Sequence, residues 1–228
     1  MTLHYSRFPV DASGAAKAAG DGQLHGRGLY RRYGKRVLDI ALVVLAAPFV
    51  LPLVTALALL VALDGGRPFY TQMRVGMHGR HFRMWKLRSM VVDADARMAA
   101  HLAADPEARR EWDETQKLRR DPRVTQFGAF LRKSSLDELP QLWNVLLGDM
   151  SLVGPRPMMT QQEPLYPSPA YYAVRPGVTG YWQTAGRGRT SFAARAHYDA
   201  AYVEDLSLPT DIAVLARTVS VVVRGTGS

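Results

Sequence analysis

The sequence contains no cysteine, which excludes disulfide bonds and thiolate metal sites as sources of its stability. Internal repeats are also absent. Hydrophobic residues make up 47% of the chain and charged residues 21%, a composition that excludes a disordered or fibrous protein. With 228 residues, the chain has room for one domain and a modest appendage.

Acidic residues are the scarcer charged class, with 20 Asp and Glu against 29 Lys and Arg and a net charge of +9. This balance favours polyanionic partners, which include nucleic acid, anionic lipid headgroups and phosphorylated small molecules. The four tryptophans are dispersed, at positions 85, 112, 143 and 182. Because a groove for single-stranded nucleic acid interleaves basic and aromatic residues, we expect lipid and phosphate partners and no nucleic acid.

The N-terminal part divides into a tail and an apolar unit. Residues 1–28 are rich in Ala, Gly and Ser without apolar periodicity, which predicts a disordered tail. Residues 29–64 combine a basic flank with Ile40–Leu63, a run of 24 residues without a charge that is long enough to enter a membrane. It is too long, and starts too late, for a cleavable signal peptide. The basic flank indicates contact with lipid headgroups, although a solvated helix face is the alternative.

Two features of the apolar run predict a re-entrant membrane segment, helix–break–helix, rather than a straight span. Pro48 and Pro52 each remove a backbone hydrogen bond, so we expect the break there. Both flanks are basic, with seven Lys and Arg in residues 1–36 and six in residues 64–88. A straight span cannot place both flanks on the cytoplasmic side, as the positive-inside rule requires. A proline-kinked single span is the alternative.

Residues 65–228 form the third predicted unit of the chain. We expect a mixed α/β fold that is mainly helical, with a short β element. Two short strands are predicted in 68–90, with a turn at His78-Gly79, and a helix in 91–120, interrupted near Asp105-Pro106. Two short helices in 121–148, joined at Lys133-Ser134, are expected next. A structured loop in 150–188 and a helix over 211–223 complete the prediction.

Candidate chemistry centres on Asp137 and Glu138. One interpretation is a capping box, with Ser135 at the N-cap of a helix and Glu138 three residues later. The other is catalytic: a carboxylate beside free backbone donors and many basic residues suits attack on a phosphoryl group. Such a carboxylate can act as a nucleophile that forms an acyl-phosphate, or as a ligand for a divalent ion.

Basic residues supply candidate phosphate contacts. In Gly154-Pro155-Arg156-Pro157 two prolines fix the backbone around Arg156, whose planar guanidinium suits bidentate phosphate binding. A rigid loop with a solvent-facing arginine is the alternative. Lys86 and Arg88 would lie on one face of a strand, with the same two interpretations.

Three runs of residues resemble the bacterial sugar transferases, which are monotopic phosphoglycosyl transferases that prime glycan assembly. The runs are Asp121–Thr125, Ser135–Val145 and Gly148–Pro157. Further resemblance lies in Lys35–Asp39, Lys86–Met90 and Arg175–Gly180, and it covers about residues 33–227. Motifs of this length and order are highly specific.

The resemblance implies a reaction and a location. A hexose 1-phosphate passes from a UDP-sugar to undecaprenyl phosphate, a polyprenyl phosphate, with release of UMP, at the cytoplasmic face of the bacterial inner membrane. Residues 65–228 would be a cytosolic catalytic domain lying on the membrane surface. Asp137 would be the covalent nucleophile and a ligand of Mg²⁺, and Glu138 would have a supporting role. Membrane lipid is a further expected partner, and a homo-oligomer is left open. The candidate phosphate and substrate contacts are Lys86, Arg88, Arg132, Arg156, Pro157 and Arg175.

Departures from the family pattern bear on which sugar the protein transfers. Many members carry Glu inside a Gln-Glu-Arg run where this chain has Gln72-Met73-Arg74, and many have Glu after Pro-Arg-Pro where it has Met158-Met159. The second departure, with Gly180–Gln183, is similar to the exopolysaccharide branch and favours galactose or glucose. The alternative function is a non-catalytic scaffold or anionic-lipid-binding module of a polysaccharide assembly complex.

Overall fold

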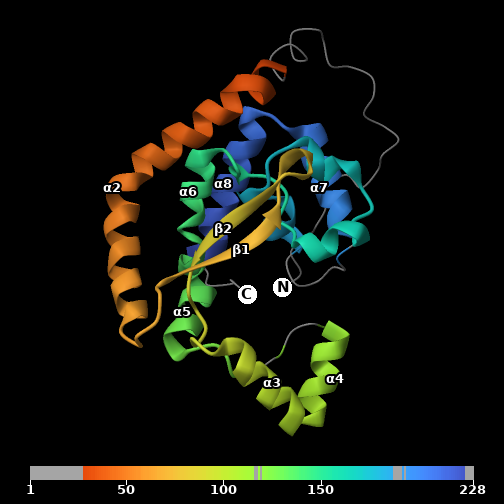
Figure 1. Cartoon of the computed structure of the whole chain (residues 1–228). Coiled ribbons are helices and arrows are strands. Elements are labelled where there is room, and N and C mark those ends of the chain that lie inside the picture. Colours follow the sequence, from red (N-terminus) through yellow and green to blue (C-terminus); the bar gives the residue numbers. More distant parts are fainter. Residues whose placement is uncertain (1–27, 116–117, 119, 187–191, 193, 224–228) are drawn as a thin grey trace, which may run out of the picture.

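The computed structural model describes residues 28–115, 118, 120–186, 192 and 194–223. The predicted disordered tail therefore lies outside the described residues, except for Gly28. The described chain is a mainly helical mixed α/β fold, as predicted, with two small sheets in place of the single β element that was expected. Figure 1 shows one long helix, α2, running along the outside of the remaining elements.

Helix α2 spans Lys35–Ala62 and follows a π-helical turn, Tyr30–Gly34. It is the one helix, among the residues that the structure describes, whose length and apolar composition would allow it to cross a membrane. The predicted break is wrong, because α2 is continuous through Pro48 and Pro52. Figure 1 shows its axis bending near the middle instead. A proline removes one hydrogen bond and crowds one carbonyl, which bends a helix that its other bonds still hold together.

Both ends of α2 pack against the same body. Near the N-terminal end, Val43 joins a buried cluster with Met84 and Val145. Near the C-terminal end, Leu57, Ala58 and Val61 join another cluster with Leu87 and Leu131. The middle of the helix exposes large apolar side chains, among them Leu45, Phe49 and Leu51. Such a continuous exposed apolar surface is typical of contact with lipid or with another protein.

The predicted hairpin is confirmed. Strand β1, Phe69–Val75, pairs antiparallel with β2, His81–Leu87. The turn contains a short 3₁₀ segment, Met77–Gly79, in which His78 and Gly79 have φ of 58° and 75°. His at positive φ is uncommon, and Gly beside it lowers the cost of the turn.

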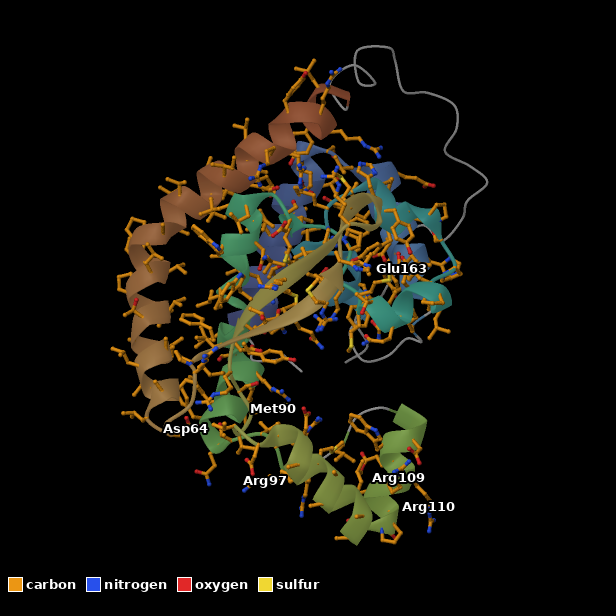
Figure 2. All side chains as sticks on the ribbon, viewed as in Figure 1. Asp64, Met90, Arg97, Arg109, Arg110 and Glu163 are labelled. Carbon is orange, nitrogen blue, oxygen red and sulfur yellow. The ribbon has the colours of Figure 1, made fainter. Side chains whose placement is uncertain are left out.

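The next two helices form an arm that projects from the body (Figure 1). They are α3, Ala94–Ala104, and α4, Pro106–Thr115. The predicted interruption at Asp105 is confirmed, since its carboxylate accepts hydrogen bonds from the backbone N–H groups of Glu107 and Ala108. Figure 2 shows Arg97, Arg109 and Arg110 on this arm.

Two short helices follow, as predicted, with a 3₁₀ turn between them. The predicted junction at Lys133-Ser134 is wrong, because both residues still belong to the first helix. Helix α5 spans Gln126–Ser134, the turn spans Leu136–Glu138, and α6 spans Gln141–Leu147. The capping-box interpretation is wrong. Ser135 adopts a left-handed conformation with φ of 57°, and its side chain makes no capping hydrogen bond. It is the residue at which α5 ends, and it does not cap the start of the next helix as a capping box requires.

The region predicted as a structured loop also contains a parallel strand pair. Strand β3, Ser151–Val153, pairs with β4, Gly177–Thr179. The chain segments come so close that a Cβ on Gly177 would lie 2.1 Å from the backbone nitrogen of Gly154, a contact that only glycine tolerates. Short 3₁₀ segments, Thr160–Leu165 and Pro169–Ala173, and a π-helical turn, Trp182–Gly186, complete this region.

Two helices end the described chain. Helix α7, Arg195–Asp205, had no counterpart in the sequence-based prediction. Helix α8 spans Leu208–Val223, and so begins three residues before the predicted start at Asp211. The two pack with β3 through a cluster that includes Val153, Tyr202 and Val214.

Candidate active site

Asp137 lies in the tight turn between α5 and α6. The left-handed Ser135 reverses the chain after α5, and Leu136 then packs on the cluster of Leu87 and Leu131. This anchoring buries the next residue, so that Asp137 is only 7% exposed. A carboxylate costs free energy when buried, and it must find charged or polar partners there.

Those partners come from strand β2. The Lys86 ammonium donates a hydrogen bond to Oε1 of Glu138 over 2.8 Å and lies 3.9 Å from Oδ2 of Asp137. Burial raises the pKa of Asp137 above its usual value and Glu138 adds to the rise, whereas the charges of Lys86 and Arg132 oppose it. The site therefore holds two adjacent carboxylates against one shared cation.

A small polar pocket of about 10 Å³ opens beside this pair. It receives side chains from the hairpin, from the turn and start of α6, and from the loop after β3. Its lining residues are Arg74, Met84, Lys86, Glu138, Gln141, Arg156, Pro157, Gly177 and Val178. The guanidinium of Arg156 lies 5.8 Å from the centre of the Trp182 ring, a cation–π contact that orients it. Three of the lining residues are cationic, so the pocket suits a phosphorylated ligand.

An apolar groove of about 360 Å³ lies on the other side of the same turn, between α2 and α6. Leu139 and Pro140, which directly follow Glu138, form part of its wall. The other lining residues are Val43, Ala47, Val50, Leu51, Val54, Phe69, Trp85, Leu142, Trp143 and Leu146. Segment 138–141 thus contributes residues both to a cationic pocket and to an apolar groove.

The structure gathers some of the predicted site residues and separates others. Lys86, Arg156 and Pro157 line the pocket with Glu138, and Asp137 lies beside Lys86. Arg132 is close enough for its charge to influence Asp137, and its Nε donates to Oγ of Ser89 over 2.8 Å.

Arg88 and Arg175 lie elsewhere. Arg88 donates to the Val61 carbonyl over 2.9 Å and pairs with Asp64, which Figure 2 shows at the end of α2. Arg175 donates to the Gly148 carbonyl over 2.8 Å at the end of α6. Burial lowers the pKa of Arg175, and the nearby Arg36 lowers it further. In this structure both arginines fix the packing around α2 and α6 rather than lining the pocket.

Sequence reasoning missed five lining residues of the pocket, of which Arg74 and Gln141 have polar side chains. Gln141 is almost fully buried, at 2% exposure, and it starts α6. Arg74 could have been found from the predicted hairpin: with the turn at His78-Gly79, alternation along paired strands places Arg74 and Lys86 on one face.

Asp137 and Glu138 are the candidate metal ligands of this site. Among the described residues, no group of three or more His, Asp or Glu could hold a metal ion. Mg²⁺ is usually bound through one or two carboxylates, with water and substrate phosphates completing its shell. Asp137 and Glu138 fit that donor set, although Glu138 already accepts a hydrogen bond from Lys86.

A buried carboxylate, a cationic pocket and an apolar groove thus lie close together around one short turn. The chain belongs to the bacterial sugar transferase family, whose sequence model matches residues 30–225. The predicted family membership is therefore confirmed.

Individual relatives point in the same direction. The chain is 45% identical over 199 residues to the UDP-galactose-lipid carrier transferase of Erwinia amylovora, covering 86% of this chain and 42% of that protein. It is 44% identical to the undecaprenyl-phosphate galactose phosphotransferase of Salmonella typhimurium, with the same coverage. It is 42% identical over 197 residues to the exopolysaccharide production protein ExoY of Rhizobium meliloti, covering 85% and 87% of the two chains. The chain thus spans less than half the length of the first two relatives.

Proposed function

We propose that the protein is a phosphoglycosyl transferase that moves a hexose 1-phosphate from a UDP-sugar to undecaprenyl phosphate and releases UMP. The names of its relatives support both the nucleotide-sugar donor and the lipid carrier, and one relative links the family to exopolysaccharide production. Galactose and glucose are the favoured sugars. The observation that carries the proposal is the buried Asp137, which directly precedes Glu138 of the cationic pocket and Leu139 of the apolar groove.

The two cavities match the two substrates. A UDP-sugar carries its charge on a diphosphate, which the cations of the polar pocket neutralise. A polyprenyl phosphate is an apolar chain with an anionic end. Since Leu139 and Pro140 line the groove while Glu138 and Gln141 line the pocket, a chain lying in the groove would present its phosphate close to Asp137.

The proposed chemistry has two displacements. The Asp137 carboxylate attacks the β-phosphorus of the UDP-sugar, the bond from that phosphorus to the bridging oxygen breaks, and UMP leaves with the electron pair. Asp137 then carries the sugar phosphate as an acyl-phosphate. A phosphate oxygen of the carrier attacks the same phosphorus, and the bond to Asp137 breaks, which frees the carboxylate and gives the polyprenyl diphosphate sugar.

The chain's own residues prepare these steps. Lys86 favours the ionised form of Asp137, which is the attacking form, and Glu138 holds Lys86 in place. Arg156, oriented on Trp182, neutralises charge on the phosphates. Mg²⁺, when bound at Asp137 and Glu138 with the substrate phosphates, would supply further neutralisation of the diphosphate.

The membrane arrangement is part of the same proposal. Helix α2 dips into the bilayer and returns, which would place the catalytic domain at the cytoplasmic face of the inner membrane. Three observations support this arrangement: the exposed apolar middle of α2, the attachment of both its ends to one body, and the exposed Arg31 and Arg32 at its start.

A panel of UDP-sugars tests the proposed function. The full chain in detergent is incubated with undecaprenyl phosphate, Mg²⁺ and each UDP-sugar, and UMP is measured. We expect the wild-type protein to release UMP from at least one UDP-hexose. Asp137→Asn should release none, although its melting temperature equals that of the wild type. If no sugar gives UMP with protein that binds UDP-sugar, the chain is a scaffold or a lipid-binding module.

A further inference from the structure

Arg74 is a cation of the polar pocket to which the steps above give no individual role. It faces Phe82 across the hairpin, and Lys86 faces Tyr70. Since every second residue of a strand points to the same face, Arg74 and Lys86 lie on one face of the sheet. Both line the polar pocket, together with Arg156 from the loop after β3.

Hydrogen bonds hold the Arg74 guanidinium in a fixed orientation. Its Nη1 donates to the Pro157 carbonyl over 3.1 Å, and its Nη2 donates to Oε1 of Gln72 over 2.6 Å. Its backbone also pairs with Met159. The Nε is buried and makes no hydrogen bond within the described part of the chain. A preorganised guanidinium with one unused buried donor is suited to bind an anion.

Within the described part of the chain, Arg74 forms no ion pair with a carboxylate. Glu138, the carboxylate that lines the pocket, is paired with Lys86. Burial lowers the pKa of Arg74 to about 10 and the like charge of Arg156 contributes, so the side chain is still protonated at neutral pH. Two guanidiniums in one buried pocket repel each other, and a ligand with two negative groups would relieve that repulsion.

We propose that Arg74 and Arg156 together bind the diphosphate of the nucleotide sugar, so that the pocket distinguishes a diphosphate from a monophosphate. This inference rests on the proposed function. One phosphate would be engaged by a single cation, whereas two linked phosphates engage both arginines. UMP, which keeps one phosphate after the transfer, would then lose a contact and leave more readily.

The test is a pair of binding measurements on the full chain in detergent. Isothermal titration calorimetry gives the Kd of a methylene-bridged UDP analogue, which resists cleavage, and the Kd of UMP. We expect wild-type protein to prefer the diphosphate. Arg74→Gln should weaken diphosphate binding by at least about tenfold, the usual effect of losing a charge-assisted hydrogen bond, and UMP binding by less than about threefold.

Arg83 provides the matched control, because it is exposed on the opposite face of the same hairpin. Arg83→Gln removes the same charge and should leave both Kd values within about twofold of wild type. If Arg74→Gln does not fold, Arg74→Lys replaces it. Lysine keeps the charge but lacks the planar fork, so the preference for diphosphate should still fall by at least about threefold.

The outcomes separate this inference from the proposed function. Equal weakening of UMP and diphosphate binding, an unchanged preference, or no preference in the wild type would each overturn the role of Arg74. If the wild-type protein prefers the diphosphate but releases no UMP from any UDP-sugar, the proposed function is wrong and the diphosphate site is still supported.

Discussion

The Lys86 ammonium lies 2.8 Å from Oε1 of Glu138, and this ion pair joins strand β2 to the turn that carries the buried Asp137. The side chains of Lys86 and Glu138 are 20% and 15% exposed, so water screens their interaction only partly. A lysine held in this way serves both carboxylates at once. The packing of β2 against this turn therefore sets the position of the Lys86 charge relative to Asp137.

Replacing Glu138 by Gln tests this positioning. Lys86 would lose its charged partner and shift toward Asp137, so we expect UMP release to fall by roughly 10- to 100-fold with an unchanged melting temperature. Glu163→Gln is the matched control, since Glu163 lies 3.5 Å from His81 in a more exposed contact and should retain activity within about twofold. Equal activity of the two variants would argue against a role for the Lys86–Glu138 pair.

The pH dependence of the reaction follows from the burial of Asp137. Its pKa is raised, and the ionised form is the nucleophile, so activity should fall with decreasing pH through a pKa above that of an exposed Asp. Lys86 is the largest influence that lowers this pKa. In Lys86→Met the acidic limb of the kcat/KM profile should therefore move to higher pH. A limb that stays in place would show that Lys86 does not control the ionisation of Asp137.

Anchoring of α2 should contribute strongly to stability. Lys35 and Asp211 form an ion pair of 2.7 Å with side chains 10% and 1% exposed, and Asp211 also accepts hydrogen bonds from Tyr30 and Tyr202. Removing one partner of a buried pair leaves an uncompensated charge, so Lys35→Met should lower the free energy of unfolding by about 3–5 kcal/mol.

Urea denaturation in detergent measures this loss. Arg109→Gln is the comparison, because Arg109 and Asp113 form an exposed pair one helical turn apart, worth no more than about 0.5 kcal/mol. If both substitutions cost the same, the Lys35–Asp211 pair does not anchor the helix.

The re-entrant topology predicts that the two ends of α2 face the cytoplasm. Arg32 and Arg67 are exposed and flank the helix, and the native chain has no cysteine. Arg32→Cys and Arg67→Cys should both resist an impermeant maleimide in intact spheroplasts and react after permeabilisation. Labelling of either one from the periplasm would favour the kinked single span. Replacing Pro48 and Pro52 together by Leu should shift the helix toward that span, because both missing hydrogen bonds are restored.

The sequence allowed the hairpin, the interrupted arm and the Asp137 segment to be located. Each has a strong local signal: alternation with a turn at His78-Gly79, a proline after Asp105, and a long family motif around Asp137. The continuity of α2 could not be predicted, because its packing and remaining hydrogen bonds decide whether a proline bends or ends a helix. The pairing of β3 with β4 joins two three-residue strands across a long connection, which local pattern does not encode.

The roles of the basic residues were harder to separate. Arg88 and Arg156 look alike in sequence, each beside a motif residue, yet one binds the end of α2 and the other lines the pocket. The capping interpretation of Ser135 failed because the same Ser-x-x-Glu spacing also fits a left-handed residue at a helix end. Only tertiary contacts distinguish these cases.

The covalent intermediate is the most direct test of the account. Full-length protein with a UDP-sugar and Mg²⁺, but without polyprenyl phosphate, should release up to one UMP per active site and then stop. Its intact mass should rise by one hexose phosphate, located on the peptide 134–143, and Asp137→Asn should show neither change. With both substrates, initial rates should follow a ping-pong pattern. Release of UMP only when the carrier is present, by enzyme that is active with it, would contradict the account and indicate direct transfer.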